Sequence, residues 1–291
     1  MEQGFVKVAS ATPRIRVADP VYNAQVICEQ AKEAAEHGAK IVVFPELCIT
    51  GYTCNDLFLQ ELLLEKAKEA LLTIAEETGQ LETLFLVGLP VDKDGRLYNV
   101  AAVLYRGRIL GMIPKKNIPM YAEFYEGRHF TPGEETVTEY RLGKQVIPFG
   151  SNLLFRCEEL PELILGCELC EDLWVAEPPS TSHALMGATV IANLSASNET
   201  VSKDDYRTLL IKASSARLLC GYIYTSAGEG ESTQDLVFGG HDLIAENGTL
   251  LVQSARFTTG ILYTDLDVLK ISSERRRMGT FGKRPMKPYL T

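Results

Sequence analysis

The chain has 291 residues, 46% of them hydrophobic, so it can bury a sizeable core in one large or two ordinary domains. Its 38 Asp and Glu against 29 Lys and Arg give a net charge of -9, which disfavours nucleic acid and anionic membranes as partners. Seven cysteines scattered in apolar stretches, no signal-like start and no apolar run long enough for a bilayer lead us to expect a cytoplasmic, non-membrane protein.

The first half of the chain alternates strand and helix patterns. A strand over residues 5–10 precedes a helix over 23–37, whose apolar residues recur at helical spacing, and a short β-branched strand over 41–44. There follow a predicted helix over 56–77, a buried strand over 84–89, and a hairpin of strands over 98–105 and 109–113. This order is typical of an α/β fold.

The second half repeats the alternation. We expect strands over 163–169, 190–194 and 222–226, helices over 180–186 and 204–220, a hairpin over 241–253 and a last strand over 261–265. The unbroken alternation predicts one α/β domain with mixed sheets over residues 1–271. Residues 272–291 carry six Lys and Arg against Glu274 alone and are expected to form a basic C-terminal arm or linker.

Three segments that end or follow predicted strands carry a carboxylate, an amine and a thiol. Glu46 follows Phe44-Pro45, Lys115 lies in Pro-Lys-Lys-Asn-Ile-Pro, and Cys170 ends the strand over 163–169. Together they supply a base, a cation and a nucleophile, which suffice to attack a carbon–nitrogen bond through a thioester. The constellation predicts an enzyme.

Each of these residues also has an ordinary structural interpretation. A cysteine in an apolar run is usually an inert core residue, and Glu46 and Lys115 could each be solvated. Strand geometry separates the cysteines, because it places Cys167 inside and Cys170 at the carboxyl end of the strand, where α/β sites form. The same geometry disfavours Cys167 and Cys170 as a redox pair or half a zinc site, and the four histidines show no ligand spacing, so we expect no metal.

Taken jointly, the three segments resemble the nitrilase, or carbon–nitrogen hydrolase, superfamily. The motifs are Phe-Pro-Glu-Leu at 44–47, Pro-Lys-x-x-Ile-Pro at 114–119 and Cys-Glu-Asp at 170–172. Within it, the chain is most similar to the glutamine amidotransferase domain of glutamine-dependent NAD+ synthetase. That likeness rests on the segments 50–52, 121–126, 170–174, 178–180, 192–197 and 227–233.

The resemblance implies an α-β-β-α sandwich with two mixed sheets and outer helices. It implies that Cys170 is the nucleophile, Glu46 the base, Lys115 the cation near the oxyanion, and Glu126 a glutamate that steadies the lysine. It further places six residues at glutamine-binding positions, with Trp174 where Phe is usual and Lys203 where Arg is expected: Tyr52, Tyr121, Glu171, Trp174, Ser197 and Lys203.

The implied reaction is hydrolysis of glutamine to glutamate and ammonia, with no cofactor, for use by NAD+ synthetase. ATP and deamido-NAD+ would bind a synthetase domain, whose Ser-Gly-Gly-x-Asp-Ser loop does not occur in this sequence. We therefore expect an excised amidase domain that works with a synthetase domain or subunit, or a free-standing amidohydrolase, and in either case a homo-oligomer. The alternatives are an amidase for ω-amides or carbamoyl amines, and a non-catalytic scaffold or redox module.

Overall fold

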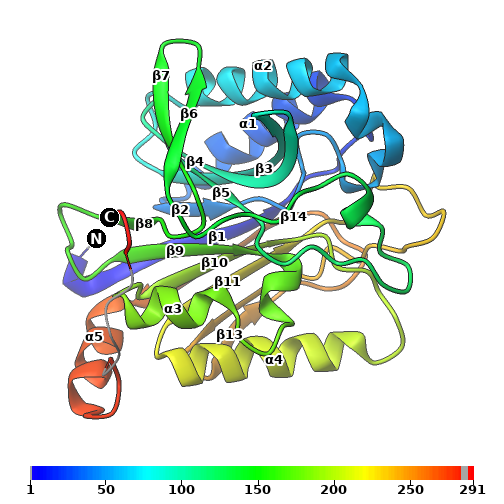
Figure 1. Ribbon diagram of the computed structural model, residues 1–291. Coiled ribbons are helices and arrows are strands. Elements are labelled where there is room, and N and C mark those ends of the chain that lie inside the picture. The colour runs from blue at the N-terminus through cyan, green and yellow to red at the C-terminus, as the bar shows by residue number, and fades with distance from the viewer. Residues whose placement is uncertain (1, 283–287) are drawn as a thin grey trace.

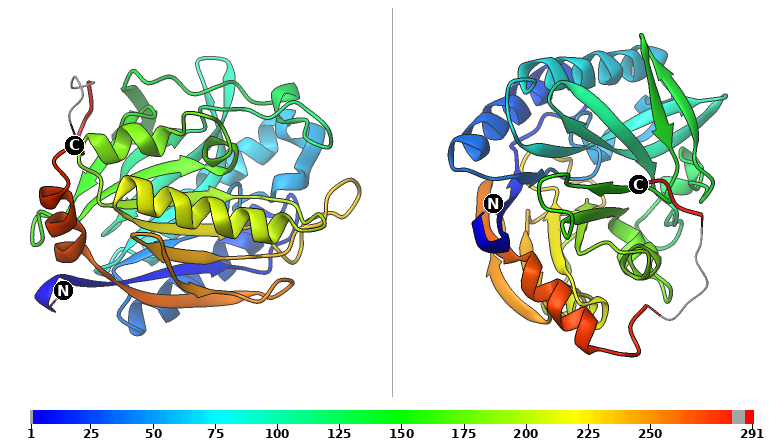
Figure 2. Two further views of the ribbon diagram at one scale, coloured as in Figure 1. Left: turned by 90° about the horizontal axis from the view of Figure 1, so that it is seen from below. Right: turned by 90° about the vertical axis from the view of Figure 1, so that its left-hand side faces the viewer.

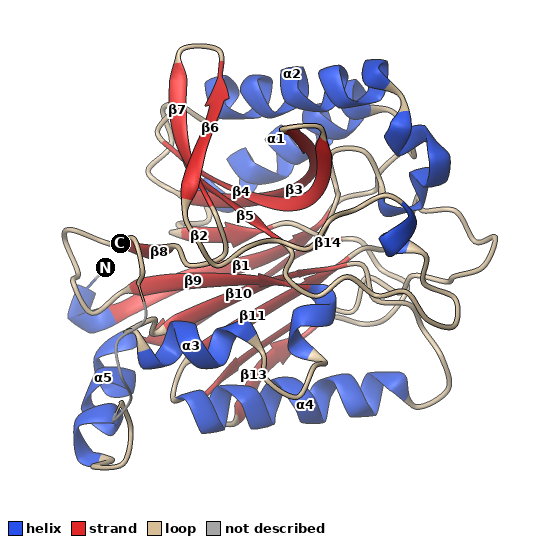
Figure 3. Ribbon diagram, viewed as in Figure 1, coloured by secondary structure: helices blue, strands red, loops and turns tan. Residues whose placement is uncertain are grey.

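A computed structural model describes residues 2–282 and 288–291. Within these residues, two mixed β-sheets face one another, and helices cover their outer faces (Figure 1). Coloured by secondary structure, the strands gather in the middle of the molecule with helices above and below them (Figure 3). This is the predicted α-β-β-α sandwich.

The first sheet has the strand order β14-β1-β2-β3-β4-β5-β7-β6. Its strands are β1 (Phe5–Thr12), β2 (Ile41–Val43), β3 (Leu84–Lys93), β4 (Arg96–Tyr105), β5 (Arg108–Pro114), β6 (Thr138–Leu142), β7 (Gln145–Phe149) and β14 (Gly260–Asp267). Its outer face is covered by α1 (Pro20–Glu36) and α2 (Glu61–Glu77). Asp19 begins α1, since its side chain accepts a hydrogen bond from the Tyr22 N–H at 3.1 Å and Pro20 follows it.

The second sheet has the strand order β13-β12-β11-β10-β9-β8. Its strands are β8 (Leu154–Arg156), β9 (Ile164–Leu169), β10 (Val190–Ser195), β11 (Gly221–Ser226), β12 (Leu243–Glu246) and β13 (Thr249–Gln253). The helices α3 (Pro179–Leu185) and α4 (Lys203–Leu218) pack on its outer face, and Figure 2 shows α4 lying across it. Short 3-10 helices occur as η1 (Glu2–Gly4), η2 (Tyr52–Leu59), η3 (Glu126–Arg128) and η4 (Cys170–Leu173).

The core between the sheets explains the unbroken apolar runs in the sequence. Side chains such as Val43 from β2, Cys167 from β9 and Ala192 from β10 form one buried cluster there. Because β2, β9 and β10 are buried on both faces, their residues do not alternate in polarity. The chain after β2 meets the carboxyl end of β10, where the Glu46 N–H donates to the Ser195 carbonyl at 3.3 Å. This edge of the sandwich holds the candidate site.

Two parts of the predicted secondary structure were wrong. The predicted helix over 56–77 divides into η2 and α2, with Gln60 extended between them. Tertiary contacts hold η2, because Asp56 accepts hydrogen bonds from Arg128 at 2.6 and 2.8 Å. The strands β6, β7 and β8 were not predicted. They are short, with five residues in β6, five in β7 and three in β8, so the alternation that marks a strand has little length in which to show.

The helix α5 (Val268–Arg277) crosses the boundary that the sequence analysis placed after residue 271. Arg275 fixes it to the body by donating to the carbonyls of Ala188 at 2.6 Å and Leu218 at 2.9 Å. Of the basic arm, Lys283, Arg284 and Lys287 lie outside the described residues. Beyond them, the Leu290 carbonyl accepts a hydrogen bond from the Leu154 N–H at 2.9 Å, so residues 288–291 contact β8. No helix in the described part of the chain is long and apolar enough to cross a membrane.

Candidate active site

Glu46, Lys115 and Glu126 meet in one buried cluster. The Lys115 Nζ lies 2.7 Å from Glu46 Oε1 and 2.6 Å from Glu126 Oε1. Glu46 and Lys115 have no exposed side-chain surface, and Glu126 is almost fully buried. Burial alone would lower the pKa of the Lys115 ammonium, but the carboxylates of Glu126 and Glu46 outweigh it and raise that pKa well above its ordinary value. The lysine is therefore held charged inside the protein.

Two groups that the sequence analysis missed complete the cluster. Asn99 on β4 donates from Nδ2 to Glu46 Oε1 at 2.7 Å and to Glu126 Oε2 at 3.3 Å. The backbone N–H of Ala196, after β10, donates to Glu46 Oε2 at 2.9 Å. An amide side chain within the apolar run of β4 was a visible signal for Asn99, whereas a backbone donor has no signature in the sequence.

Glycine at position 88 permits the close approach of β3 to the segment that carries Glu46. A Cβ added at Gly88 would lie 2.2 Å from the backbone N of Leu47 and 2.6 Å from the carbonyl O of Pro45. Real atoms do not approach that closely, so the larger residue would displace this backbone. Position 88 thus sets where Glu46 lies.

Cys170 lies at the carboxyl end of β9, as predicted, and begins η4. Its backbone has φ of 41°, a left-handed conformation that is uncommon for residues other than glycine and clusters at functional sites. Burial raises the pKa of its thiol to about 12, Glu46 raises it as well, and Lys115 opposes them. The thiol is therefore protonated at neutral pH, and the cation alone does not produce a resting thiolate.

Cys170 opens onto a cavity of about 420 Å³, large enough for a small organic ligand. Five of the residues expected to bind substrate line it as well, namely Tyr121, Glu171, Trp174, Ser197 and Lys203. The Lys203 Nζ lies 5.3 Å from the ring centroid of Trp174, and burial lowers its pKa. The Tyr121 hydroxyl donates to the Glu171 carboxylate at 2.9 Å. The cavity thus presents a cation and carboxylates to the same small volume.

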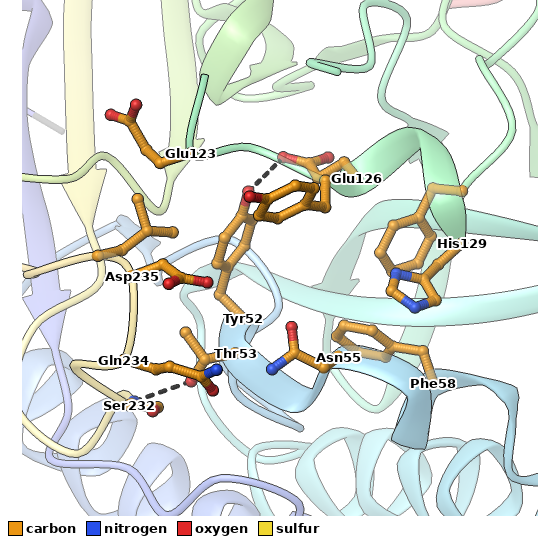
Figure 4. A pocket seen from close by; sticks show the side chains of 13 residues that line it. Tyr52, Thr53, Asn55, Phe58, Glu123, Glu126, His129, Ser232, Gln234 and Asp235 are labelled. Atoms are coloured by element: carbon orange, nitrogen blue, oxygen red, sulfur yellow. Dashed lines mark hydrogen bonds between the residues drawn. The ribbon is translucent and has the colours of Figure 1, made fainter. Parts of the chain in front are cut away.

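Tyr52 lies elsewhere. It lines a separate cavity of about 50 Å³, together with residues such as His129 and Asp235 (Figure 4). Its hydroxyl donates to Glu126 Oε1 at 2.8 Å, shown as a dashed line in Figure 4. The structure therefore makes Tyr52 a direct partner of Glu126 and does not place it on the cavity of Cys170.

Within the described residues, no group of three or more His, Cys, Asp or Glu side chains is arranged to hold a metal ion. Cys167 is buried in the core between the sheets. The reactive groups at this edge of the sandwich are a thiol, two carboxylates and an ammonium. Such a set, placed beside a cavity, is typical of a hydrolase.

Comparison with known proteins agrees with this class. The carbon–nitrogen hydrolase family matches residues 7–276, and the chain belongs to that family. It is therefore a hydrolase, and the predicted resemblance is confirmed. The glutamine-dependent NAD(+) synthetase of Mycobacterium tuberculosis is 43% identical over 282 residues, which are 96% of this chain and 42% of the relative. That of Thermotoga maritima is 32% identical over 274 residues, 91% of this chain and 43% of the relative. The chain thus spans less than half the length of these curated relatives.

Solved structures show the same fold. A glutamine-dependent NAD(+) synthetase from Cytophaga hutchinsonii superposes with a TM-score of 0.82 at 28% identity, over 90% of this chain and 43% of that one. An amidase from Nesterenkonia sp. AN1 superposes with a TM-score of 0.74 at 20% identity, over 96% of this chain and 97% of that one. The second likeness concerns the fold alone.

Proposed function

We propose that this chain hydrolyses the side-chain amide of glutamine to glutamate and ammonia through a cysteine thioester. The observation that carries the proposal is the buried Glu46–Lys115–Glu126 cluster, whose charges act on the thiol of Cys170 at the wall of a ligand-sized cavity. The relatives are named glutamine-dependent NAD(+) synthetases, and this name supports glutamine as the amide that is hydrolysed.

In the first half of the reaction, Glu46 takes the thiol proton as the Cys170 Sγ attacks the amide carbon. The resulting oxyanion accepts a hydrogen bond from Lys115. An ammonium has three N–H donors. Among the described residues Lys115 Nζ donates to Glu46 and Glu126, so the third N–H would serve the oxyanion. A backbone N–H near Glu171 supplies the second donor. The proton held by Glu46 passes to the leaving nitrogen, and ammonia departs.

In the second half, water attacks the thioester carbon. Glu46 takes a proton from that water and returns it to the sulfur as the carbon–sulfur bond breaks, so glutamate leaves and the thiol is restored. One water is consumed for each glutamine hydrolysed. The role of Glu46 as a base follows from the high pKa of Cys170, since a protonated thiol needs an acceptor for its proton.

The cavity of Cys170 suits an amino acid better than a simple amide. Lys203 would face the α-carboxylate, and the Glu171 carboxylate the α-ammonium. Tyr121, Trp174 and Ser197 line the same cavity. Tyr52 would act on this reaction through Glu126.

The ammonia would serve an NAD+ synthetase domain or subunit that binds ATP and deamido-NAD+. Support for this setting comes from the relatives, which are named glutamine-dependent NAD(+) synthetases and are more than twice as long as the matching region. The amidase reaction itself would need no cofactor. We further propose that the chain works as a homo-oligomer in the cytoplasm.

The test measures ammonia and glutamate released from glutamine, asparagine and short aliphatic amides. We expect a strong preference for glutamine, and faster turnover when a synthetase partner is added. Cys170→Ser should release no ammonia, and a diazo-oxo-norleucine label should map to Cys170 by mass spectrometry. The control is Cys157→Ser, a partly buried cysteine outside the site, which should keep both properties. Equal rates on aliphatic amides would instead favour a general amidase, and an unlabelled Cys170 would refute the thioester.

A further inference from the structure

Asp172 connects two segments that carry different parts of the candidate site. Its side chain is almost fully buried. Asp172 Oδ1 accepts hydrogen bonds from the backbone N–H of Asn117 at 2.8 Å and from Asn117 Nδ2 at 2.7 Å. Asp172 Oδ2 accepts from the backbone N–H of Leu169 at 3.1 Å and weakly from that of Lys116 at 3.4 Å. One carboxylate thus holds backbone groups from both segments.

These backbone groups are direct neighbours of the reactive side chains. Lys116 and Asn117 follow Lys115 at the end of β5, which belongs to the first sheet. Leu169 precedes Cys170 at the end of β9, which belongs to the second sheet. The core between the sheets is apolar there, and apolar contacts are not directional. Hydrogen bonds to Asp172 are directional, so they fix the position of one segment relative to the other.

The backbone of Cys170 also needs such support. Its φ of 41° is a strained conformation for a residue with a side chain, and strain of this kind persists only where neighbouring contacts enforce it. The bond from the Leu169 N–H to Asp172 closes the turn around Cys170 from residue 169 to residue 172. Without it, the turn could relax and move the sulfur.

We propose that Asp172 is a positioning residue that sets the distance between the Cys170 thiol and the Lys115 ammonium. Within the described residues, Asp172 is not part of the lining of the 420 Å³ cavity, so it acts through Cys170 and Lys115 and does not contact substrate. The proposal rests on the proposed amidase function. It predicts a loss in the chemical step with little change in substrate binding.

The first experiment compares Asp172→Asn with the native chain. Asparagine keeps the volume of the side chain. Its NH₂ group, however, would stand where one carboxylate oxygen of Asp172 now accepts hydrogen bonds, and an NH₂ group cannot accept from those N–H donors. We expect kcat for glutamine to fall about a hundredfold and KM to stay within about threefold, because an ångström of misplacement can cost that much in rate. Alkylation of Cys170 by iodoacetamide, followed by peptide mapping, should slow at least tenfold by the same reasoning, as a rough figure.

A matched control is Glu246→Gln. Glu246 is also a buried carboxylate, and it accepts a hydrogen bond from the backbone N–H of Asp267 at 2.7 Å. It lies far from Cys170, because it is opposite Gly221, the first residue of β11, at the other end of the second sheet. It should lose stability without losing kcat or slowing alkylation. If Asp172→Asn does not fold, Asn117→Ala removes the 2.7 Å side-chain bond alone and should lower kcat by about tenfold, again with KM retained.

Three results would overturn the proposal: kcat and alkylation within threefold of native in the folded variants, a change confined to KM, or an equal loss of kcat in Glu246→Gln. If the native chain hydrolyses no amide, the proposed function fails. The alkylation rates of Cys170 then still decide whether Asp172 positions the sulfur.

Discussion

Replacing Lys115 with methionine tests whether one ammonium holds two buried carboxylates in place. Methionine fills similar space but removes the charge that lies 2.7 Å from Glu46 and 2.6 Å from Glu126. Removing one partner of a buried ion pair destabilises a protein by about 3–5 kcal/mol, because the other charge stays desolvated. We therefore expect the free energy of unfolding of Lys115→Met at pH 7 to be lower than that of the native chain by about 3–5 kcal/mol.

The loss of stability should depend on pH through Glu126. Burial raises the pKa of Glu126 and Lys115 lowers it, so removing Lys115 raises this pKa further. A carboxyl group whose folded pKa exceeds its unfolded value, about 4.3, stabilises the fold fully below that value and loses the contribution as pH rises through the folded pKa. The difference from the native chain should therefore be largest at pH 7 to 8 and shrink towards pH 5.

Urea unfolding at pH 5 and pH 7 measures both effects. The matched control is Lys116→Met, because the Lys116 ammonium pairs with the half-exposed Glu135 at the surface. That pair should contribute about 0–1 kcal/mol, with little change between the two pH values. Adding Glu126→Gln to Lys115→Met should recover part of the loss. A stability within 1 kcal/mol of native at pH 7, or a deficit that grows as pH falls, would refute the reasoning. The glutaminase activity of Lys115→Met should fall about a hundredfold or more, since the proposed oxyanion donor is lost.

Three further variants or conditions test other parts of the site. Gly88→Ala should displace the backbone at Leu47 and lower kcat more than about tenfold. Gly279→Ala, whose new Cβ meets nothing within 4 Å, should leave kcat unchanged. Kinetics and circular dichroism of both variants check this. Alkylation of Cys170 should still be accelerating near pH 10, because burial raises its pKa to about 12, and a plateau at neutral pH would indicate a resting thiolate instead. Arg207→Met should raise KM about tenfold with a smaller change in kcat, because Arg207 Nη2 donates to Ser197 Oγ at 3.2 Å and Ser197 lines the cavity. An unchanged KM would show that Arg207 has no role in substrate binding.

The convergence of Glu46, Lys115 and Cys170 was predictable because each follows a buried strand. Lys115, after β5, pairs with Glu46, after β2, and Asp172 holds Asn117, after β5, together with Leu169 at the end of β9. The ends of these three strands therefore meet, as strand ends in α/β folds often do. What the sequence could not provide was the register between the two sheets. That register decides that the Ala196 N–H donates to Glu46 and that the Tyr52 hydroxyl donates to Glu126.

The same limit explains the secondary structure that was missed. The residues of η2 have helical apolar spacing, but Asn55 has φ of 50° and the segment is held by contacts with Arg128 and His129. Arg128 and His129 lie 72 and 73 residues after Asp56 in the sequence. Local periodicity describes one segment at a time, so it cannot report contacts of this range.

The charges around Cys170 favour a mechanism in which proton transfer accompanies attack. If Lys115 served to create a thiolate, the thiol would titrate below its ordinary pKa, but burial and Glu46 shift it upward instead. The ammonium is engaged by two carboxylates, which offset its charge at the sulfur in the resting site. When Glu46 takes the thiol proton, one of those negative charges disappears. The field of Lys115 then acts on the oxyanion as it forms. This order makes the cation most effective in the transition state, where stabilisation accelerates the reaction.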